Sequence, residues 1–184
     1  MLFESKALVC LFSLLIIISC DSKVRRLSID DNDLKLEDSI MLYKEKPYTG
    51  ILFSKADTTT TYRVTYVEGK KEGKEQQFYL NGDLAVERFY TQGKKSGTHR
   101  AWWNNRQLKF IHHFDNIGNL VSAQREWYSN GQMSKEFNYR DGQEEGTQKL
   151  WGVDGKIIAN YQVRNGEKFG LIGSEFCKSG AYED

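Results

Sequence analysis

The chain has 184 residues, with 26 Lys and Arg against 25 Asp and Glu, which gives a formal net charge of +1. A nearly neutral chain without a basic block lacks the positive face that nucleic-acid binding requires, so we expect no nucleic-acid partner. Hydrophobic residues (39%) and aromatic residues (13%) are frequent enough to exclude a wholly disordered chain. The single proline favours long hydrogen-bonded strands, because proline cannot donate to a strand ladder.

An uncharged run from Ala7 to Ile18 follows a short amino-terminal stretch with one lysine. As a helix this run would rise only about 18 Å, too little to cross a bilayer core of about 30 Å. Its length fits the apolar region of a secretory signal peptide. The run leads into Ile-Ile-Ser-Cys at 17–20, which resembles the lipobox of bacterial lipoproteins and implies cleavage before Cys20 and lipidation of its thiol. The alternative is a plain signal peptide in which Cys20 is incidental.

Lipidation of Cys20 would anchor the protein in a membrane of the bacterial cell envelope, and the sequence leaves the membrane and its side open. Residues 1–19 would then be the signal peptide, and the charged, aromatic-poor residues 20–42 would form a tether. Cys10 would leave with the signal peptide, so Cys177 would remain as one thiol without an internal disulfide partner. We interpret Cys177 as a small apolar residue near the end of the fold.

A period of about 24 residues runs through the rest of the chain. In register, each unit contains two small residues spaced by four, then an aromatic, a turn dipeptide and an aliphatic. The small pairs are Gly69/Gly73, Gly93/Gly97, Gly118/Ser122, Gly142/Gly146 and Gly166/Gly170. The aromatics are Phe78, Trp102, Trp127 and Trp151, and the dipeptides are Asn81-Gly82, Asn105-Arg106, Asn130-Gly131 and Asp154-Gly155. A degenerate first unit begins near Tyr43, with a glycine at Gly50 and a turn at 57–61.

Each unit is predicted to contain two strands and two turns. Asn-Gly and Asp-Gly favour a type I′ hairpin turn, in which both central residues have positive φ. A second set of turns lies at the other end of the units: Glu68-Gly69, Gln92-Gly93, Asp141-Gly142 and Asn165-Gly166. We therefore predict an all-β fold, a repetitive antiparallel β-meander over 43–177 that forms one elongated, twisted or curled sheet, followed by a tail at 178–184. Helix is expected only in the signal peptide.

One face of the predicted sheet is apolar. Every second residue of the returning strands is apolar or aromatic at thirteen of sixteen positions, and the alternate set is mostly polar. A single layer must curl over such a face, roof it with the segment 34–43, or offer it to a partner. The candidate partner-binding surface is an aromatic strip on this face: Phe110, Phe114, Phe137, Tyr139 and Tyr161. The aromatic column of the outgoing strands, from Phe78 to Trp151, is either a packing ladder or a second exposed strip.

The order Gly-Lys-x-x-Gly, aromatic residues, Asn-Gly and a closing Tyr resembles the bacterial variant of the MORN repeat. The best matches are 69–73 with 78–82, and 127–131, and the resemblance covers roughly 43–173. The sequence departs from the pattern at three positions: Arg106, Ser122 and Gly152. The resemblance implies an elongated antiparallel sheet that binds proteins or lies at membranes, and it brings no catalytic residues. Many bacterial proteins with such repeats are labelled antitoxins by similarity alone.

No motif predicts catalysis, a cofactor or a small-molecule substrate. His112 and His113 are adjacent on a strand and point to opposite faces, so they cannot bind one metal ion together. His99 and His113 could approach across a hairpin, but the sequence offers no third ligand, and we predict no metal site. An envelope hydrolase is disfavoured because the sequence contains no nucleophile–base constellation.

The sequence thus favours a non-enzymatic, membrane-anchored repeat lipoprotein that acts as a protein-binding or scaffold module in the bacterial envelope. The alternative is an antitoxin or immunity protein that neutralises an envelope-acting toxin. A lipoprotein beyond the inner membrane could not reach a toxin in the cytosol, which restricts this alternative to toxins that act in the envelope.

Overall fold

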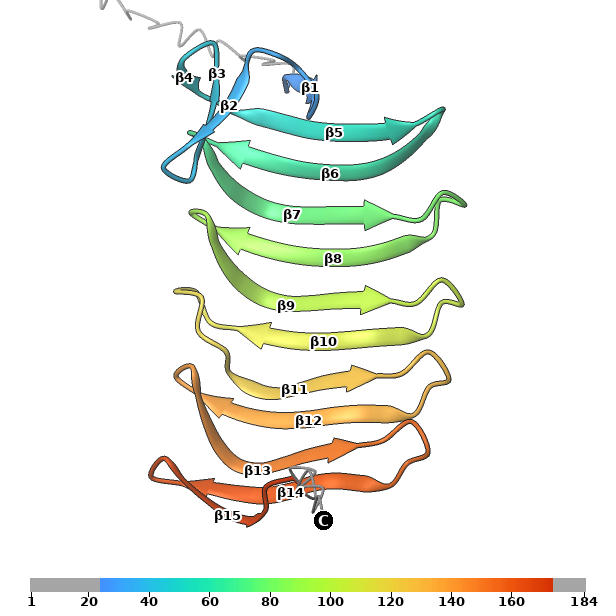
Figure 1. Ribbon diagram of the computed structural model, residues 1–184. Coiled ribbons are helices and arrows are strands. Elements are labelled where there is room, and N and C mark those ends of the chain that lie inside the picture. The colour runs from blue at the N-terminus through green and yellow to red at the C-terminus, as the bar shows by residue number, and fades with distance from the viewer. Residues whose placement is uncertain (1–23, 174–184) are drawn as a thin grey trace, which may run out of the picture.

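The computed structural model of the protein describes residues 24–173, which form fifteen strands (Figure 1). In chain order the strands are β1 (Arg26–Ser28), β2 (Leu34–Glu37), β3 (Ile40–Tyr43), β4 (Lys46–Pro47), β5 (Gly50–Ala56), β6 (Thr59–Val67), β7 (Lys70–Phe78), β8 (Leu84–Thr91), β9 (Lys94–Trp102), β10 (Leu108–Phe114), β11 (Ser122–Trp127), β12 (Met133–Arg140), β13 (Gln143–Trp151), β14 (Ile157–Arg164) and β15 (Glu167–Leu171). The predicted signal peptide, Cys20, Cys177 and the tail at 178–184 lie outside the described residues.

Twelve of these strands form one long, open sheet with the order β1-β5-β6-β7-β8-β9-β10-β11-β12-β13-β14-β15. From β5 onward each strand pairs with its neighbours in sequence, so the sheet is a meander without crossovers (Figure 1). The remaining three strands form a small sheet with the order β2-β3-β4. The predicted all-β hairpin meander is confirmed, and the described residues contain no helix.

Tight turns of two residues join consecutive units at one edge of the sheet, except between β10 and β11, which are joined by the longer loop 115–121. Both residues of these turns have positive φ, as at Glu68 (48°) and Gly69 (77°), which identifies the type I′ turn. The turn glycine also ties its unit to the preceding one, because Gly93 donates its backbone N–H to the carbonyl oxygen of Lys71 at 2.9 Å. The predicted second set of turns is therefore confirmed.

The loops at the opposite edge differ from the predicted type I′ turns. Residues 79–83 separate two strands, and of the predicted dipeptide only Gly82 (84°) has positive φ. Gly82 N–H donates to Tyr79 O, and Tyr79 N–H donates to Asp83 O, both at 2.9 Å; this is a type I turn followed by a glycine bulge. Asn81 stabilises the loop, because its Oδ1 accepts the N–H of Asp83 at 3.0 Å. The Asn or Asp of the next three units accepts the equivalent N–H.

The amino-terminal part of the fold corrects two boundaries. The predicted tether at 20–42 is folded over its described residues, because β1 pairs in parallel with β5 and β2 pairs with β3. The predicted turn at 57–61 is reduced to Asp57 and Thr58, since β6 begins at Thr59. Of the charged residues that suggested a tether, Asp30, Asp31 and Asp33 lie between β1 and β2, and Arg26 lies in β1 itself. Composition alone does not separate this pattern from a linker.

The two faces of the long sheet differ in burial. On the inner face, alternate strand residues are buried: Leu52, Val64, Tyr66, Ala101, Ala159, Tyr161 and Val163. The outer face carries one row of register partners that crosses the sheet and is mostly charged or polar: Phe53, Arg63, Gln76, Glu87, Arg100, Ile111, Arg125, Glu136, Lys149, Asn160 and Leu171. The predicted division into an apolar face and a polar face thus holds across the array.

The β2–β3 hairpin covers the inner face only at the amino-terminal end. Its residues Leu34, Met41 and Tyr43 pack on a buried cluster that contains Leu52 and Val64. Met41 N–H donates to the turn glycine Gly69 O at 2.8 Å, which fixes the hairpin to the edge of the long sheet. One of the three expected arrangements, a roof made from 34–43, therefore applies to the first unit. Among the described residues no second layer covers the inner face of the later units.

The outgoing strands β7, β9 and β13 bend near their starts, where Figure 1 shows them curving steeply. The register explains the bend: Glu87 pairs with Arg100, but Phe89 pairs with Ser96, so β9 has two more residues than β8 between these pairs. Gly97 lies within this bulge with φ of 64°. A residue with a β-carbon is disfavoured in that region of φ, which explains the glycines Gly73, Gly97 and Gly146 at this position, although Ser122 adopts the same conformation with φ of 61°.

A buried polar side chain fills each bulge, six residues after the turn glycine of its unit. These plug residues are Glu75, His99, Gln124 and Gln148. Gln148 is 0% exposed, and its amide accepts the N–H of Asn138 at 2.8 Å and donates to the carbonyl oxygen of Asn138 at 2.9 Å. The side chain thus replaces the strand partner that the bulge removes from Asn138. Gln124 makes the same two bonds to His113, at 2.8 and 3.2 Å.

The loops are linked from unit to unit by the aromatic residue that follows the predicted aromatic column. Tyr79, Trp103 and Tyr128 each donate a side-chain hydrogen bond, at 2.8 to 3.0 Å, to the backbone carbonyl of the column residue in the next unit: Trp102, Trp127 and Trp151. Among the described residues no ring-to-ring contact joins two members of the column. The aromatic column therefore links the units through its backbone carbonyl groups and not through ring stacking. Its rings are partly buried.

Replacing Gln148 by Leu should destabilise the fold, because two buried backbone groups of Asn138 would lose their partners. We expect the free energy of unfolding to fall by about 2–4 kcal/mol, measured by chemical denaturation. The matched control is Gln143→Leu, an exposed glutamine of the same strand, which should change stability by less than about 0.5 kcal/mol. Equal effects of the two substitutions would contradict the plug role.

Candidate functional site

The predicted aromatic strip lies on the inner face in the middle and last units. Phe110, Phe114, Phe137 and Tyr139 are partly buried. Tyr161 differs, because it is only 5% exposed and belongs to a core cluster with Ala159 and Val163. The structure thus leaves four rings of the strip partly open to solvent and makes the fifth a core residue.

Neighbouring side chains hold these rings in place. Phe110 stacks on His112 with 4.5 Å between ring centroids, and Phe114 lies at the same distance from His99. Phe137 meets Tyr161 edge to face at 6.1 Å. The strip is therefore a packed surface with fixed rings rather than a set of mobile aromatic side chains.

Lysine side chains of β9 and β12 extend over the strip. The ammonium of Lys95 lies 5.3 Å from the centroid of Phe114, and that of Lys135 lies 4.8 Å from the centroid of Phe137. Lysine stems of this kind shield apolar surface from water and keep the charge exposed. A partner of the strip would meet aromatic rings bordered by positive charges.

Carboxylates interrupt this cationic border: Glu144 accepts a hydrogen bond from Tyr161 Oη at 3.2 Å, and Glu126 lies nearer the middle of the strip. Glu126 Oε1 lies 3.1 Å from His112 Nε2 and 3.3 Å from Lys135 Nζ. The hydrogen bond from His112 and the nearby charge of Lys135 lower the pKa of Glu126 to about 2, although partial burial opposes ionisation. Glu126 is therefore ionised at neutral pH and balances part of the positive charge along the strip.

The histidines lie on different faces, as predicted, but the pairing across the hairpin is different. His112 is the register partner of His99, whereas His113 pairs with Thr98 and its Nδ1 lies 3.0 Å from Thr98 Oγ1. The predicted approach of His99 to His113 is thus wrong, because the β9–β10 register places them one residue apart. Within residues 24–173 no group of three or more His, Cys, Asp or Glu side chains could hold a metal ion.

The plug residue of the first complete unit is a buried carboxylate, Glu75, which is 2% exposed. Burial opposes its ionisation, but the hydrogen bonds and charges of Lys71 and Arg88 prevail and lower its pKa. Arg88 Nη1 lies 2.8 Å from Glu75 Oε1, and Lys71 contacts the other oxygen. All these groups pair with one another, so the cluster fills the bulge in place of an amide.

His99 is a plug residue with a neutral ring. It is 2% exposed, and its Nε2 lies 2.8 Å from the carbonyl oxygen of Phe89, which requires a proton on that nitrogen. Burial lowers the pKa of His99, and the nearby charges of Arg88 and Lys95 act in the same direction. The folded protein therefore resists protonation of this ring.

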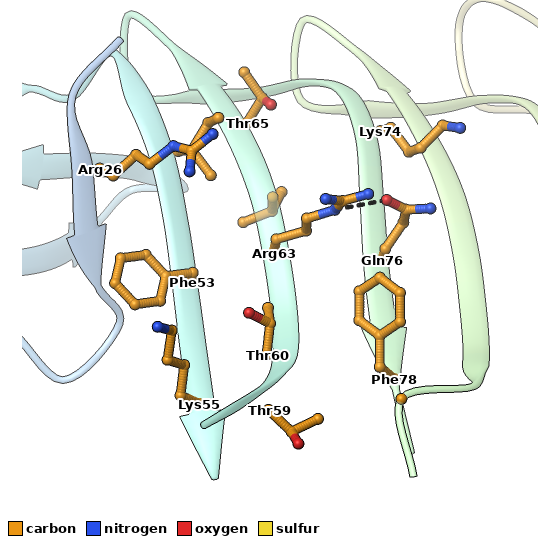
Figure 2. Close-up of a pocket in the computed structure, with 13 residues that line it drawn as sticks. Arg26, Phe53, Lys55, Thr59, Thr60, Arg63, Thr65, Lys74, Gln76 and Phe78 are labelled. Atoms are coloured by element: carbon orange, nitrogen blue, oxygen red, sulfur yellow. Dashed lines mark hydrogen bonds between the residues drawn. The ribbon is translucent and has the colours of Figure 1, made fainter. Parts of the chain in front are cut away.

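A groove of about 950 Å³ lies on the outer face of β5, β6 and β7, at the amino-terminal end of the array (Figure 2). Its lining contains four cationic side chains and no carboxylate: Arg26, Lys55, Arg63 and Lys74. Figure 2 shows Phe53 beside Lys55, and Phe78 beside the hydrogen-bonded pair of Arg63 and Gln76. The sequence did not predict this groove.

Two features were not predicted from the sequence, the column of plug residues and the groove. The sequence contains only weak signals of each. The plug column is visible as a polar residue six positions after each turn glycine, but its identity changes from Glu to His to Gln. The groove depends on Arg26, which the sequence placed in a tether, and on the degenerate first unit, where no column was recognised.

No protein-family model matches the chain, and no curated protein matches it. The resemblance to MORN repeats rests on the residue columns alone. Within residues 24–173 no helical segment could span a membrane.

Replacing His99 by Gln should make the fold less sensitive to acid. Because the unfolded chain takes up a proton near pH 6.5 and the folded ring does not, wild-type stability falls below that pH by up to about 1.4 kcal/mol per pH unit. The variant, which carries the plug found in the later units, should lose this component when unfolding is measured at about pH 8 and about pH 5.

The reverse substitution, Gln148→His, serves as the matched control and should introduce an extra loss of stability in acid. His113, whose pKa burial also lowers, contributes to the acid sensitivity of every variant. Unchanged pH slopes in both variants would rule out a neutral buried ring at this position of the unit.

Proposed function

We propose that the protein is a non-enzymatic binding module of the bacterial cell envelope, anchored in a membrane through a lipid on Cys20. The anchor rests on the apolar run and the Ile-Ile-Ser-Cys motif at 17–20. The MORN-like columns favour protein binding or scaffolding over catalysis, because repeat arrays offer long continuous surfaces and seldom enclose a catalytic pocket.

The observation that carries the proposal is the partly open aromatic strip between the two ends of the array. The β2–β3 hairpin covers the inner face only near Leu52 and Val64, and the rings of Phe110, Phe114 and Phe137 lie beyond it. Partly exposed, rigidly held aromatic rings are typical anchors of protein interfaces. We therefore place the partner on the inner face of β10 to β12.

The buried polar groups support a structural rather than a catalytic role. In the described part of the chain no buried side-chain nitrogen or oxygen lacks a hydrogen-bond partner. The side-chain amides of Gln124 and Gln148 form hydrogen bonds with the backbone, and the carboxylate of Glu75 forms ion pairs with two cations. None of these groups is free to serve as an acid, base or nucleophile.

Replacing Cys20 by Ala should abolish membrane anchoring, because the alanine cannot carry a lipid. We expect the variant to leave the membrane fraction or to keep its signal peptide, as measured by fractionation and intact mass. A Cys177→Ala variant is the matched control and should partition like the wild type. Unchanged partitioning and mass in the Cys20 variant would exclude the lipoprotein assignment.

The partner site is tested by capture from the native envelope followed by hydrogen exchange on the mature protein. Bound partner should slow amide exchange within 108–139 and leave the first unit unchanged. A Phe110→Ser variant should weaken capture by about tenfold or more, whereas Ile111→Ser, the neighbouring residue on the outer face, should retain it. Equal loss in both variants, or no protection in 108–139, would reject the strip as the site.

A further inference from the structure

We propose that the outer-face groove of β5, β6 and β7 binds an acidic, extended segment of a partner protein. The groove lies on the face opposite the aromatic strip, so it is a second site and goes beyond the function proposed above. Its occupant follows from three properties of its lining: uncompensated positive charge, one oriented guanidinium, and apolar surface between the charges (Figure 2).

The positive charge of the groove is largely unbalanced. Lys74 forms an ion pair with Glu87 at 2.9 Å. Arg26, Lys55 and Arg63 form no ion pair with any residue that the structure describes. Three such charges in one hollow create a local positive potential that favours an anionic ligand, even though the whole chain is nearly neutral.

Arg63 is already oriented for an anion. Its Nε donates to Gln76 Oε1 at 2.7 Å, and its guanidinium lies 5.5 Å from the centroid of the Phe78 ring. Gln76 is 7% exposed, so it is a fixed acceptor. The two terminal nitrogens of Arg63 are not used by these contacts and form the fork that binds a carboxylate in bidentate fashion.

Apolar side chains separate the cations. Ile51 and Phe53 of β5 and Phe78 of β7 are partly buried and line the groove. The hollow crosses three neighbouring strands and extends along β5 from Ile51 to Lys55. An extended peptide presents alternate side chains to one surface, so carboxylates interspersed with aromatic or aliphatic residues fit this lining.

A membrane surface fits less well than a peptide. Beyond the groove the charged row of the outer face contains carboxylates, including Glu87 and Glu136, beside the cations Arg125 and Lys149. A flat anionic surface laid on this face would meet these carboxylates as well as the groove. A peptide can occupy the groove alone, where only positive charges line the wall.

The test uses the full-length mature protein in detergent and a fluorescent peptide of sequence Glu-Phe-Glu-Asp-Phe-Glu. We expect saturable binding by fluorescence anisotropy, weaker at high salt, and no binding of the matched peptide Gln-Phe-Gln-Asn-Phe-Gln. Arg63→Gln and Lys55→Gln should each raise the peptide Kd about fivefold or more. Arg164→Gln, an exposed cation of β14 at the other end of the array, should leave it unchanged.

Three outcomes would overturn the proposal. The first is no binding of the acidic peptide by the wild type, and the second is an equal effect of Arg63→Gln and Arg164→Gln. The third is flotation with phosphatidylglycerol vesicles that depends on Arg63 while the peptide does not bind, which would assign the groove to a lipid surface. Capture of a partner by the aromatic strip is measured separately, so failure here leaves that result unaffected.

Discussion

Backbone hydrogen bonds between consecutive hairpins hold this molecule together, because the long sheet has no second layer over most of its described length. Each hairpin must therefore complete the edge of the one before it. Each bulge interrupts this backbone hydrogen bonding, because it places one residue of the returning strand opposite backbone of the outgoing strand that is out of register. Gln124 and Gln148 restore it by offering both a donor and an acceptor at that point. The repeat can thus bend at every unit without leaving buried backbone groups unpaired.

The same dependence on neighbours distinguishes the ends of the described sheet from its middle. At the amino-terminal end β1 and the β2–β3 hairpin cover the first unit, and Tyr48 and Leu52 are each 2% exposed there. At the other end β14 keeps a buried cluster of Ala159, Tyr161 and Val163, whereas Ile157 and Phe169 are each 52% exposed. Between the two ends the inner-face rings of Phe110, Phe114 and Phe137 are only partly buried, because neighbouring units flank each hairpin but no second layer lies over the face.

The sequence determined the architecture more clearly than the details, and the reason is physical. A 24-residue period with glycine turns is a local signal, because positive φ at Gly69 or Gly93 is required by the turn itself. The glycine bulge of the 79–83 loop was not predicted, because Asn-Gly serves both kinds of turn. The folded state of 26–43 depends on contacts with Leu52 and Val64, which no local pattern reports.

The same difference between local sequence signals and long-range contacts applies to the candidate sites. The aromatic strip was found from alternation alone, yet Tyr161 became a core residue through its packing against Ala159 and Val163. The groove arises from strand pairing, which brings Arg26 beside Ile51 and Arg63 beside Gln76. Arg26 and Gln76, which are 50 positions apart in the sequence, therefore line one positive hollow that composition cannot reveal.

Closure of the bulges by side-chain amides is the central claim, and native-state hydrogen exchange of individual backbone amides tests it most directly. Asn138 and His113 have no strand partner for their N–H groups and bond instead to Gln148 and Gln124. If the amides are parts of the ladder, these two N–H groups exchange as slowly as those of neighbouring strand residues such as Phe137. Fast exchange at both positions, with slow exchange on either side, would contradict the claim.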